Sequence, residues 1–307
     1  MNRWQLFFIL AGVNLLWAPV NLAVKNLNSV MSPATMSSIR WVCFTGVFWA
    51  VISIPAVRNY FKIVMPKGWD ILRAILLGML LVGPSHVIYY SALKMTTSSQ
   101  GAVLNTTGPI WTALLAVFIL HEKITPRRWL AILTGFLGTY AIIFGRNLPS
   151  FSANNATGNA VYLCAVLMET LAMVLAIKLI KRSSGPGTLA YEVIGTALGS
   201  LLVPLIAPEL AQHQVGTMNP AAFGSMLYLI FGAGLICFGL WYWIAEKAPV
   251  SLMVITIGIQ APAATLLGWY FLNEKIGLAF LVGTLMILGA LLLAGEKEEP
   301  VLEPSDA

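Results

Sequence analysis

Apolar stretches of about 20 residues recur along the whole chain, and the short connections between them carry most of the charge. A helix needs about this many residues to cross a hydrocarbon core roughly 30 Å thick. Of the 307 residues, 58% are hydrophobic and 10% are charged, whereas a soluble domain carries roughly a quarter charged residues. The chain is therefore predicted to be an all-α integral membrane protein.

Ten membrane spans are predicted. They cover residues 4–24, 35–57, 70–91, 98–120, 127–145, 158–180, 187–207, 221–245, 250–272 and 277–295. The C-terminal residues 297–307 are acidic and poor in apolar side chains, so we expect a disordered tail. The first span lacks a clear cleavage pattern, and we do not expect it to be a signal peptide.

The basic residues indicate the topology. If the N-terminus is cytoplasmic, thirteen lysines and arginines fall on the inside and four on the outside. The four outside are Lys25, Lys94, Arg146 and Lys275. This bias predicts a multi-pass protein of the inner (cytoplasmic) membrane with both termini in the cytoplasm. The net charge of +6 is thereby explained by topology, and no nucleic-acid partner is expected.

Cys43, Cys164 and Cys237 all fall inside predicted spans and lack the paired spacing of a disulfide framework or a zinc site. They are interpreted as free packing thiols, and we expect neither a metal nor a cofactor. The chain has no G-x-x-x-x-G-K-[ST] motif, so it carries no ATP-driven motor of its own.

One sequence motif occurs twice. The stretch "FILHEKI", Phe118–Ile124, returns as "YFLNEKI", Tyr270–Ile276, 152 positions later. The same shift aligns Tyr89–Ile124 with Trp241–Ile276 without a gap, and a shift of 153 aligns the first two spans with the sixth and seventh. The chain is thus predicted to contain two repeats of five spans, residues 1–150 and 151–296.

Five is an odd number, so the second repeat must cross the membrane in the opposite sense to the first. Inverted repeats of this kind bind substrate between the two halves near the bilayer midplane. The glutamates of the repeated motif, Glu122 and Glu274, each follow a helix C-terminus, where a carboxylate opposes the helix dipole. They are interpreted as structural turn residues, with a direct part in transport as the alternative.

Several motifs resemble those of a known family. They are "NLLWAPVNLAVK" in the first span, Pro33 and Arg40 in the second, "YYSALKMTTSSQGAVLNTTGP" across the third and fourth, and "LHEKI" with "LNEKI". On these the chain resembles the drug/metabolite transporter superfamily, specifically its EamA-type ten-helix exporters. The resemblance implies alternating access by two inverted bundles and export of amino acids or related small metabolites. Trp17-Ala18 departs from the usual Trp-Gly.

Polar residues inside spans are costly and should face the interior of the bundle. Nine of them are candidates to line a substrate cavity: Asn14, Trp17, Asn21, His86, Tyr89, Asn105, Trp111, Glu169 and Gln260. Glu169 lies near the middle of its span and His86 follows Pro84, and both are candidates for proton coupling. The alternatives are a protonated, hydrogen-bonded Glu169 and a packing role for His86.

Spacing connects several of the other candidates. Asn14, Trp17 and Asn21 share one helical face, which favours a wet cavity over a single interhelical bond. Asn105 and Trp111 flank Gly108-Pro109, a predicted helix interruption for which Gln260 and Pro262 are the counterpart.

Other features have simpler interpretations. Arg40 is expected to anchor its helix by snorkelling to the outer surface, or else to bind a carboxylate. Glu192 is expected to stabilise the start of its helix, and Trp241–Trp243 to form an interfacial aromatic belt. Gly195 and Gly199 permit close helix packing, either within the monomer or between two copies. The oligomeric state is left open.

The sequence favours a secondary transporter that handles a small-molecule substrate. An intramembrane lipid-modifying enzyme would need a cluster of catalytic side chains at one depth, yet His121 and His213 are expected in loops on opposite faces. A non-transporting scaffold is the remaining alternative. Substrate identity, export or import, and proton coupling or facilitated diffusion stay open.

Overall fold

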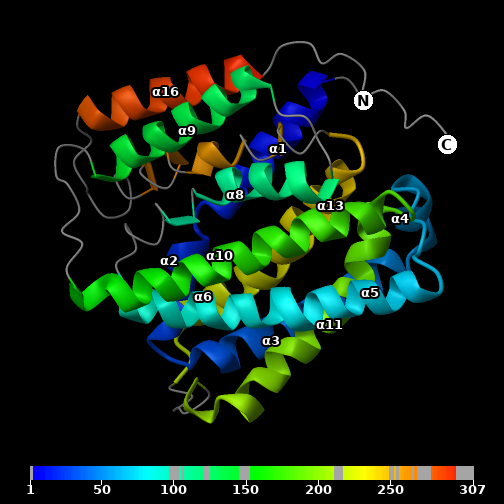
Figure 1. Cartoon of the computed structure of the whole chain (residues 1–307). Helices are drawn as coiled ribbons and strands as arrows, with labels where there is room; N and C mark the ends of the chain where they lie inside the picture. Colours follow the sequence, from blue (N-terminus) through cyan, green and yellow to red (C-terminus); the bar gives the residue numbers. More distant parts are fainter. Residues whose placement is uncertain are drawn as a thin grey trace.

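The computed structural model describes residues 3–96, 104–105, 107–120, 125–144, 153–210, 217–248, 252–253, 256–260, 262–263, 266–267 and 278–294. Within these ranges every regular element is a helix (Figure 1). Glu122, Glu274 and the tail 297–307 lie outside the described residues, so the predicted turn role of the two glutamates stays a prediction.

Among the described residues, six helical segments are long and apolar enough to cross a membrane: Trp4–Asn28, Pro33–Ile52, Trp69–Met95, Thr157–Ile180, Gly185–Ile206 and Pro220–Ala245. They correspond to predicted spans one to three and six to eight. The fourth, fifth and tenth are represented by the shorter apolar helices Ile110–Ile119, Trp129–Ala141 and Leu281–Ala290. Most of the ninth lies outside the described residues.

The long segments are built from these elements: α1 (Arg3–Trp17) with α2 (Val20–Asn28), α3 (Pro33–Ile52), α5 (Trp69–Leu77) with η1 (Gly78–Val82) and α6 (Gly83–Met95), α10 (Ala153–Ile180), α11 (Gly185–Ile206), and α12 (Pro220–Leu227) with η4 (Tyr228–Phe238) and α13 (Gly239–Ala245). The shorter elements are α4 (Pro55–Tyr60), α8 (Gly108–Leu115), η2 (Ala116–Leu120), α9 (Pro126–Phe144), η3 (Pro208–Leu210), η5 (Ile257–Ile259) and α16 (Leu278–Ala294).

The start of the second long helix is built in the same way in both halves. Ser32 caps α3 by accepting a hydrogen bond from the backbone N–H of Thr35, and Ser184 caps α11 through the N–H of Gly187. A proline follows within the first two helical positions in each case, where its fixed φ and missing N–H cost nothing. The two capping serines are 152 residues apart, the spacing of the repeated motif, which is one residue less than the shift of 153 that aligns Pro33 with Pro186.

The third long segment of each half is interrupted by π-helical backbone. These interruptions are η1, which is short, and η4, which covers eleven residues. Such wide turns are rare and often occur at functional sites. The two halves therefore share a local departure from α-helical geometry as well as their helix starts.

Side-chain hydrogen bonds tie the ends of these helices together. At one end, Asn28 Nδ2 donates to Tyr90 O at 3.2 Å, and Thr96 Oγ1 donates to Asn159 Oδ1 at 2.5 Å. At the other end, Arg182 Nη1 lies 3.2 Å from Asp70 Oδ1. The ends of α2 and α6 and the start of α10 are thus gathered at one end of the bundle, while the start of α5 meets the end of α10 at the other.

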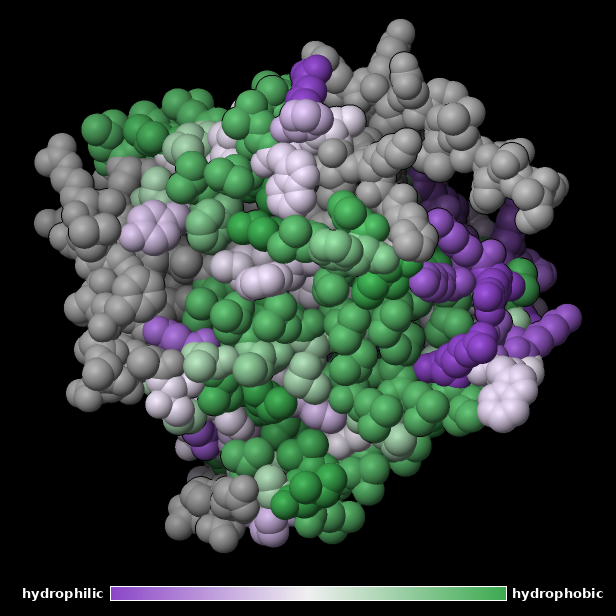
Figure 2. Space-filling view, in the orientation of Figure 1, coloured by the Kyte–Doolittle hydropathy of each residue, from purple (hydrophilic) through white to green (hydrophobic). Residues whose placement is uncertain are grey.

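The surface separates apolar and charged regions. Figure 2 shows a broad hydrophobic flank with hydrophilic residues gathered at one end, beside α4 and the start of α5. Seven exposed basic residues belong to the loops and helix ends that meet there: Arg58, Lys62, Lys67, Arg73, Lys181, Arg182 and Lys247. Large apolar side chains such as Phe8, Leu205 and Ile206 are more than half exposed on the flank, which a lipid environment would cover.

Helices α9 and α16 lie side by side (Figure 1). They run antiparallel, because Arg127 Nε near the start of α9 donates to Leu293 O near the end of α16 at 3.0 Å. Their backbones approach closely at Gly138, where an added Cβ would lie 2.7 Å from Gly283 O.

Glycines also bring α11 against the third long segment. A Cβ added to Gly195 would lie 1.8 Å from Ile75 O, and one added to Gly199 would lie 2.3 Å from Met79 O. From the opposite side, a Cβ on Gly78 would lie 1.9 Å from Glu192 O. The small-residue pair in α11 therefore serves packing within the chain.

Replacing Gly195 with alanine should destabilise the protein. The new methyl group would force α11 away from α5, and overpacking of this kind typically costs about 1–3 kcal/mol. Thermal unfolding in detergent should show a midpoint several degrees lower for Gly195→Ala. Gly46→Ala in α3 is the matched control, because a Cβ there meets nothing within 4 Å. Equal midpoints for the two variants would contradict this account.

Candidate functional site

A cavity of about 230 Å³ lies inside the bundle and is lined by both halves of the chain. A single water molecule needs roughly 10–15 Å³ on this measure, so the space can hold a small organic molecule. Seven of the nine predicted candidates line it: Trp17, Asn21, His86, Tyr89, Asn105, Glu169 and Gln260. Asn14 and Trp111 do not.

Arg40 lies on the cavity wall, although only 2% of its surface is exposed. Its Nη1 donates a hydrogen bond to Tyr90 Oη, and its Cζ lies 4.9 Å from the centroid of the Trp41 ring. Its Nε is buried without a partner, and among the described residues no carboxylate lies within ion-pair distance. The expected snorkelling to the surface does not occur, because α3 turns this face toward α6.

Glu192 lies on the same cavity and is also 2% exposed. Its Oε1 accepts a hydrogen bond of 2.6 Å from Tyr242 Oη, and its Oε2 is buried without a partner. The expected role at the helix start is filled instead by the Ser184 side chain and by Glu246, which bonds the N–H of Gly185.

These two buried groups occupy equivalent positions in the two halves. Arg40 follows its capping residue Ser32 by eight positions, and Glu192 follows Ser184 by the same number. In both pairs the tyrosine lies 50 residues further along the chain, Tyr90 for Arg40 and Tyr242 for Glu192. Each half therefore contains a tyrosine hydrogen-bonded to a buried ionisable residue at the equivalent position. That residue is an arginine in the first half and a glutamate in the second.

Glu169 differs from both, because it is exposed although it belongs to the apolar span Thr157–Ile180. It also lies on the cavity wall. Its exposed surface therefore faces the cavity. In the described part of the chain its carboxylate has no hydrogen-bond or ion-pair partner. This is the carboxylate best placed to meet a cationic group of a ligand.

His86 and Tyr89 come from α6. The His86 Nδ1 lies 2.9 Å from Val82 O and must donate to it, since a carbonyl oxygen only accepts. The His86 ring packs edge-on against Trp41, with 4.8 Å between centroids. Tyr89 Oη donates to Asn21 Oδ1 across to α2. Both side chains thus form wall contacts as well as lining the cavity.

The predicted stripe of the first span divides into two roles. Asn14 is fully buried, donates to Thr256 Oγ1 at 3.2 Å and accepts from Gln260 Nε2 at 2.8 Å. Trp17 lines the cavity, and its Nε1 donates to Ala233 O in η4 at 3.0 Å. Asn14 therefore joins the first span to the ninth, behind the wall that Trp17 helps to form.

The predicted aromatic belt is divided by the structure. Trp241 and Tyr242 are buried and line the cavity. Trp243 is half-buried and does not line it; its ring packs edge-on against Phe61, and Lys247 Nζ lies 4.5 Å from the ring centroid. The Trp17 ring packs edge-on against Phe238 and at a tilt against Trp241, with centroids 5.3 and 5.2 Å apart. The sequence signal that separates these neighbours is the shift of 152, which aligns Trp241 and Tyr242 with Tyr89 and Tyr90.

Comparison with known proteins identifies this architecture. The model of the EamA-like transporter family matches the chain twice, over residues 3–144 and 156–295. The chain belongs to the EamA-like transporter family. It is therefore a multi-pass membrane transporter with a small-molecule substrate, and not an enzyme.

Individual relatives agree with this EamA-like assignment. An uncharacterized transporter of Archaeoglobus fulgidus is 22% identical over 94% of this chain and 97% of its own length. The S-adenosylmethionine uptake transporter of Rickettsia prowazekii is 24% identical over 71% of this chain and 69% of its own. A crystal structure with 18% identity matches 95% of this chain and 97% of its own with a TM-score of 0.77, which supports the fold.

No group of three or more His, Cys, Asp or Glu side chains that could hold a metal occurs among the residues that the structure describes. Cys237 is buried, and its Sγ lies 3.6 Å from Val13 O. Cys43 and Cys164 are exposed. All three are free thiols in this EamA-like transporter.

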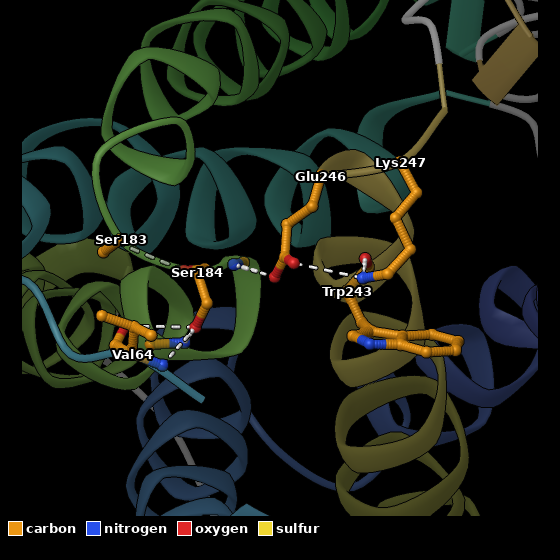
Figure 3. Close-up of polar contacts among 8 residues, drawn as sticks. Val64, Ser183, Ser184, Trp243, Glu246 and Lys247 are labelled. Atoms are coloured by element: carbon orange, nitrogen blue, oxygen red, sulfur yellow. Dashed lines mark hydrogen bonds and ion pairs between the residues drawn. The ribbon is translucent and has the colours of Figure 1, made fainter. Parts of the chain in front are cut away.

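One end of the transporter is closed by the contacts drawn in Figure 3. Ser184 Oγ accepts from Val64 N at 3.0 Å, and Glu246 Oε1 accepts from Gly185 N. A Cβ added to Gly185 would lie 1.8 Å from Tyr242 O. The loop before α5, the start of α11 and the end of α13 are therefore packed backbone to backbone at this end.

Replacing Glu246 with glutamine should loosen the start of α11. The carboxylate bonds a free N–H at the positive end of the helix, and a charge-assisted bond is worth about 1.5–3 kcal/mol. Hydrogen exchange of the first turn of α11 should become roughly tenfold faster in Glu246→Gln. Lys247→Gln is the control, since its exposed pair with Glu246 contributes little. Unchanged exchange in Glu246→Gln would contradict the assignment.

Proposed function

We propose that this protein is a secondary transporter of the cytoplasmic membrane that exports amino acids or related small metabolites by alternating access between two inverted halves of five spans each. The observation that carries the proposal is the composition of the cavity wall. Arg40 comes from the first half and Glu169 from the second. A solute that touches both holds the halves in a defined relation, as alternating access requires.

The hydrogen bonds at the helix ends support inversion. Asn28, at the end of the first long helix, bonds the end of α6, and Thr96, just past α6, bonds Asn159 near the start of α10. The first helix therefore ends on the side where α10 begins. Since α10 is the counterpart of that first helix in the shifted sequence, the two run in opposite directions.

The division of the chain into two family matches supports the repeat boundaries. The two family matches fall within residues 1–150 and 151–296, the predicted repeats. Each half contributes three long helices in the same order and with matching starts. We propose that two further spans complete each half, which makes ten in all.

The distribution of charge supports an orientation. The basic residues gathered beside α4 and the start of α5 belong to loops that the sequence places in the cytoplasm (Figure 2). At the opposite end, Lys25 and Lys94 are exposed. We therefore place the charged end of Figure 2, and with it both chain termini, in the cytoplasm.

The cavity suits a zwitterion. The Arg40 guanidinium, which no described carboxylate neutralises, attracts a carboxylate, and the exposed Glu169 carboxylate attracts an ammonium group. Between them, Trp17, Phe238 and Trp241 offer an aromatic surface for an apolar side chain. S-adenosylmethionine, which the name of the Rickettsia relative specifies, itself carries an α-amino acid group. Export, as opposed to uptake, follows the family resemblance of the sequence motifs.

Equivalent positions in the two halves should face opposite compartments. Lys25 and Lys178 are both exposed and are aligned by the sequence shift of 153. In a background without native cysteines, a membrane-impermeant maleimide should label Lys25→Cys in intact cells and Lys178→Cys only after permeabilisation. Lys247→Cys is the control and should behave like Lys178→Cys. Labelling of Lys25→Cys and Lys178→Cys from one compartment would rule out the inverted arrangement.

Replacing Arg40 with methionine should weaken recognition of the carboxylate. In proteoliposomes loaded with a panel of amino acids, KM should rise about ten- to a hundredfold, because a charge-assisted contact is lost. The corresponding amines, which lack the carboxylate, should show no such change. Arg73→Met, at the exposed pair with Asp70, is the control. Equal effects on amino acids and amines would separate Arg40 from substrate recognition, and no flux of any panel member through the wild type would refute the amino-acid assignment.

A further inference from the structure

We infer that Glu192, paired with Tyr242, is the site that binds and releases the coupling proton of this transporter. The inference rests on the proposed transport function and deepens it by naming the coupling ion and its residue. The sequence favours Glu169 and His86 as proton-coupling residues and assigns Glu192 to helix stability. The structure favours Glu192 for the coupling role instead.

The two carboxyls on the cavity differ in access. Glu169 is exposed to the cavity, so a substrate amine can reach it. Glu192 is 2% exposed, and its Oε2 has no accessible surface and no hydrogen-bond partner. In this conformation no donor bonds Glu192 Oε2, whereas the oxygen itself can carry a proton.

The cost of an unpaired charge favours the proton. A carboxylate oxygen buried without a donor loses its hydration, and an isolated buried charge is neutralised rather than tolerated. Tyr242 supplies one donor to Oε1, which leaves Oε2 unsatisfied. In this conformation the arrangement is that of a carboxylic acid with its proton on Oε2.

The internal duplication provides a comparison within the same molecule. Arg40 with Tyr90 and Glu192 with Tyr242 are equivalent pairs in the two halves. Arginine keeps its proton in every state of the cycle, while a glutamic acid gains or loses one according to its surroundings. The two halves thus provide one fixed charge and one switchable charge on a common cavity.

The contact between the start of α11 and α13 lies next to the Glu192–Tyr242 pair, and its separation would let the proton leave. Gly185, at the start of α11, contacts the backbone of Tyr242, whose side chain bonds Glu192. When this end opens, α11 and α13 separate and water reaches Glu192. The O–H bond of the carboxyl then breaks, the electron pair stays on Oε2, and water accepts the proton.

Other ionisable groups face this site from the elements packed against α11. Tyr242 comes from α13, Glu169 from α10, Arg40 from α3 and His86 from α6. Among the described lining residues, α5 and η1 contribute no ionisable side chain. Of these groups, Tyr242 alone bonds the Glu192 carboxyl.

The test measures proton movement that accompanies substrate flux. Wild-type protein and Glu192→Gln are reconstituted with a trapped pH dye, and an amino-acid gradient is applied. Glutamine keeps an acceptor for Tyr242 and cannot release a proton. We expect substrate flux to persist and the accompanying proton movement to fall at least tenfold. Wild-type proton movement in Glu192→Gln, or wild-type substrate flux without protons, would overturn the inference and leave the proposed function standing.

A second measurement detects protonation of the Glu192 carboxyl without requiring transport. Infrared difference spectra between high and low pH should contain a carboxylic acid C=O band that is absent from Glu192→Gln and present in Glu169→Gln. Identical bands in wild type and Glu192→Gln would overturn the inference even if no amino acid were transported.

A third comparison uses the duplicated tyrosines. Tyr242→Phe removes the donor that stabilises the ionised carboxylate, so the midpoint of pH-dependent proton movement should rise by roughly one pH unit, a tenfold change in proton affinity. Tyr90→Phe is the matched control, because its partner is an arginine rather than a carboxyl group, and the midpoint should stay in place. Equal midpoints in wild type and Tyr242→Phe would contradict the role of the pair.

Discussion

A polar or charged group inside a membrane must find a partner or face a cavity, and the arrangement of this protein follows from that constraint. Asn14 joins two distant spans through Gln260 and Thr256. Arg40 is held by Tyr90 and the face of Trp41, and Glu192 by Tyr242. Arg40 and Glu192, each with one buried polar atom left unpartnered, line the same cavity. Because such groups are few in a chain so apolar, their positions are the basis of the substrate site that we propose.

The two halves share their backbone geometry because they are duplicated, and their cavity side chains differ because the two sequences have diverged. The serine caps of α3 and α11, the π-helical turns of the third helices and the spacing to the paired tyrosines recur in both halves. The side chains that face the cavity do not recur: arginine in one half corresponds to glutamate in the other. In the function that we propose, the shared backbone framework lets the two halves exchange conformations, and their opposite charges hold a zwitterion.

Most of the cavity-lining candidates could be predicted from the sequence, because each is a polar or aromatic residue inside an apolar span. Glu169 and His86 were identified because a polar side chain deep in an apolar span has few tolerable environments. Arg40 and Glu192 were assigned to snorkelling and to helix stability, because both lie close enough to a helix start for those roles. Their true partners, Tyr90 and Tyr242, lie on other helices 50 residues away, and no local pattern reports such a pairing.

The sequence by itself determined that the chain is a bundle of membrane helices, that it is duplicated and that its basic loops gather at one end, since length, hydropathy and charge are properties of each segment alone. Only the tertiary structure decided which side of each helix faces inward. Trp241, Tyr242 and Trp243 are consecutive aromatic residues, yet the first two line the cavity and the third, which is half-buried, does not. The rotation of α13 makes that difference, and it is fixed by packing at Gly185 on a neighbouring helix, a contact between distant parts of the chain.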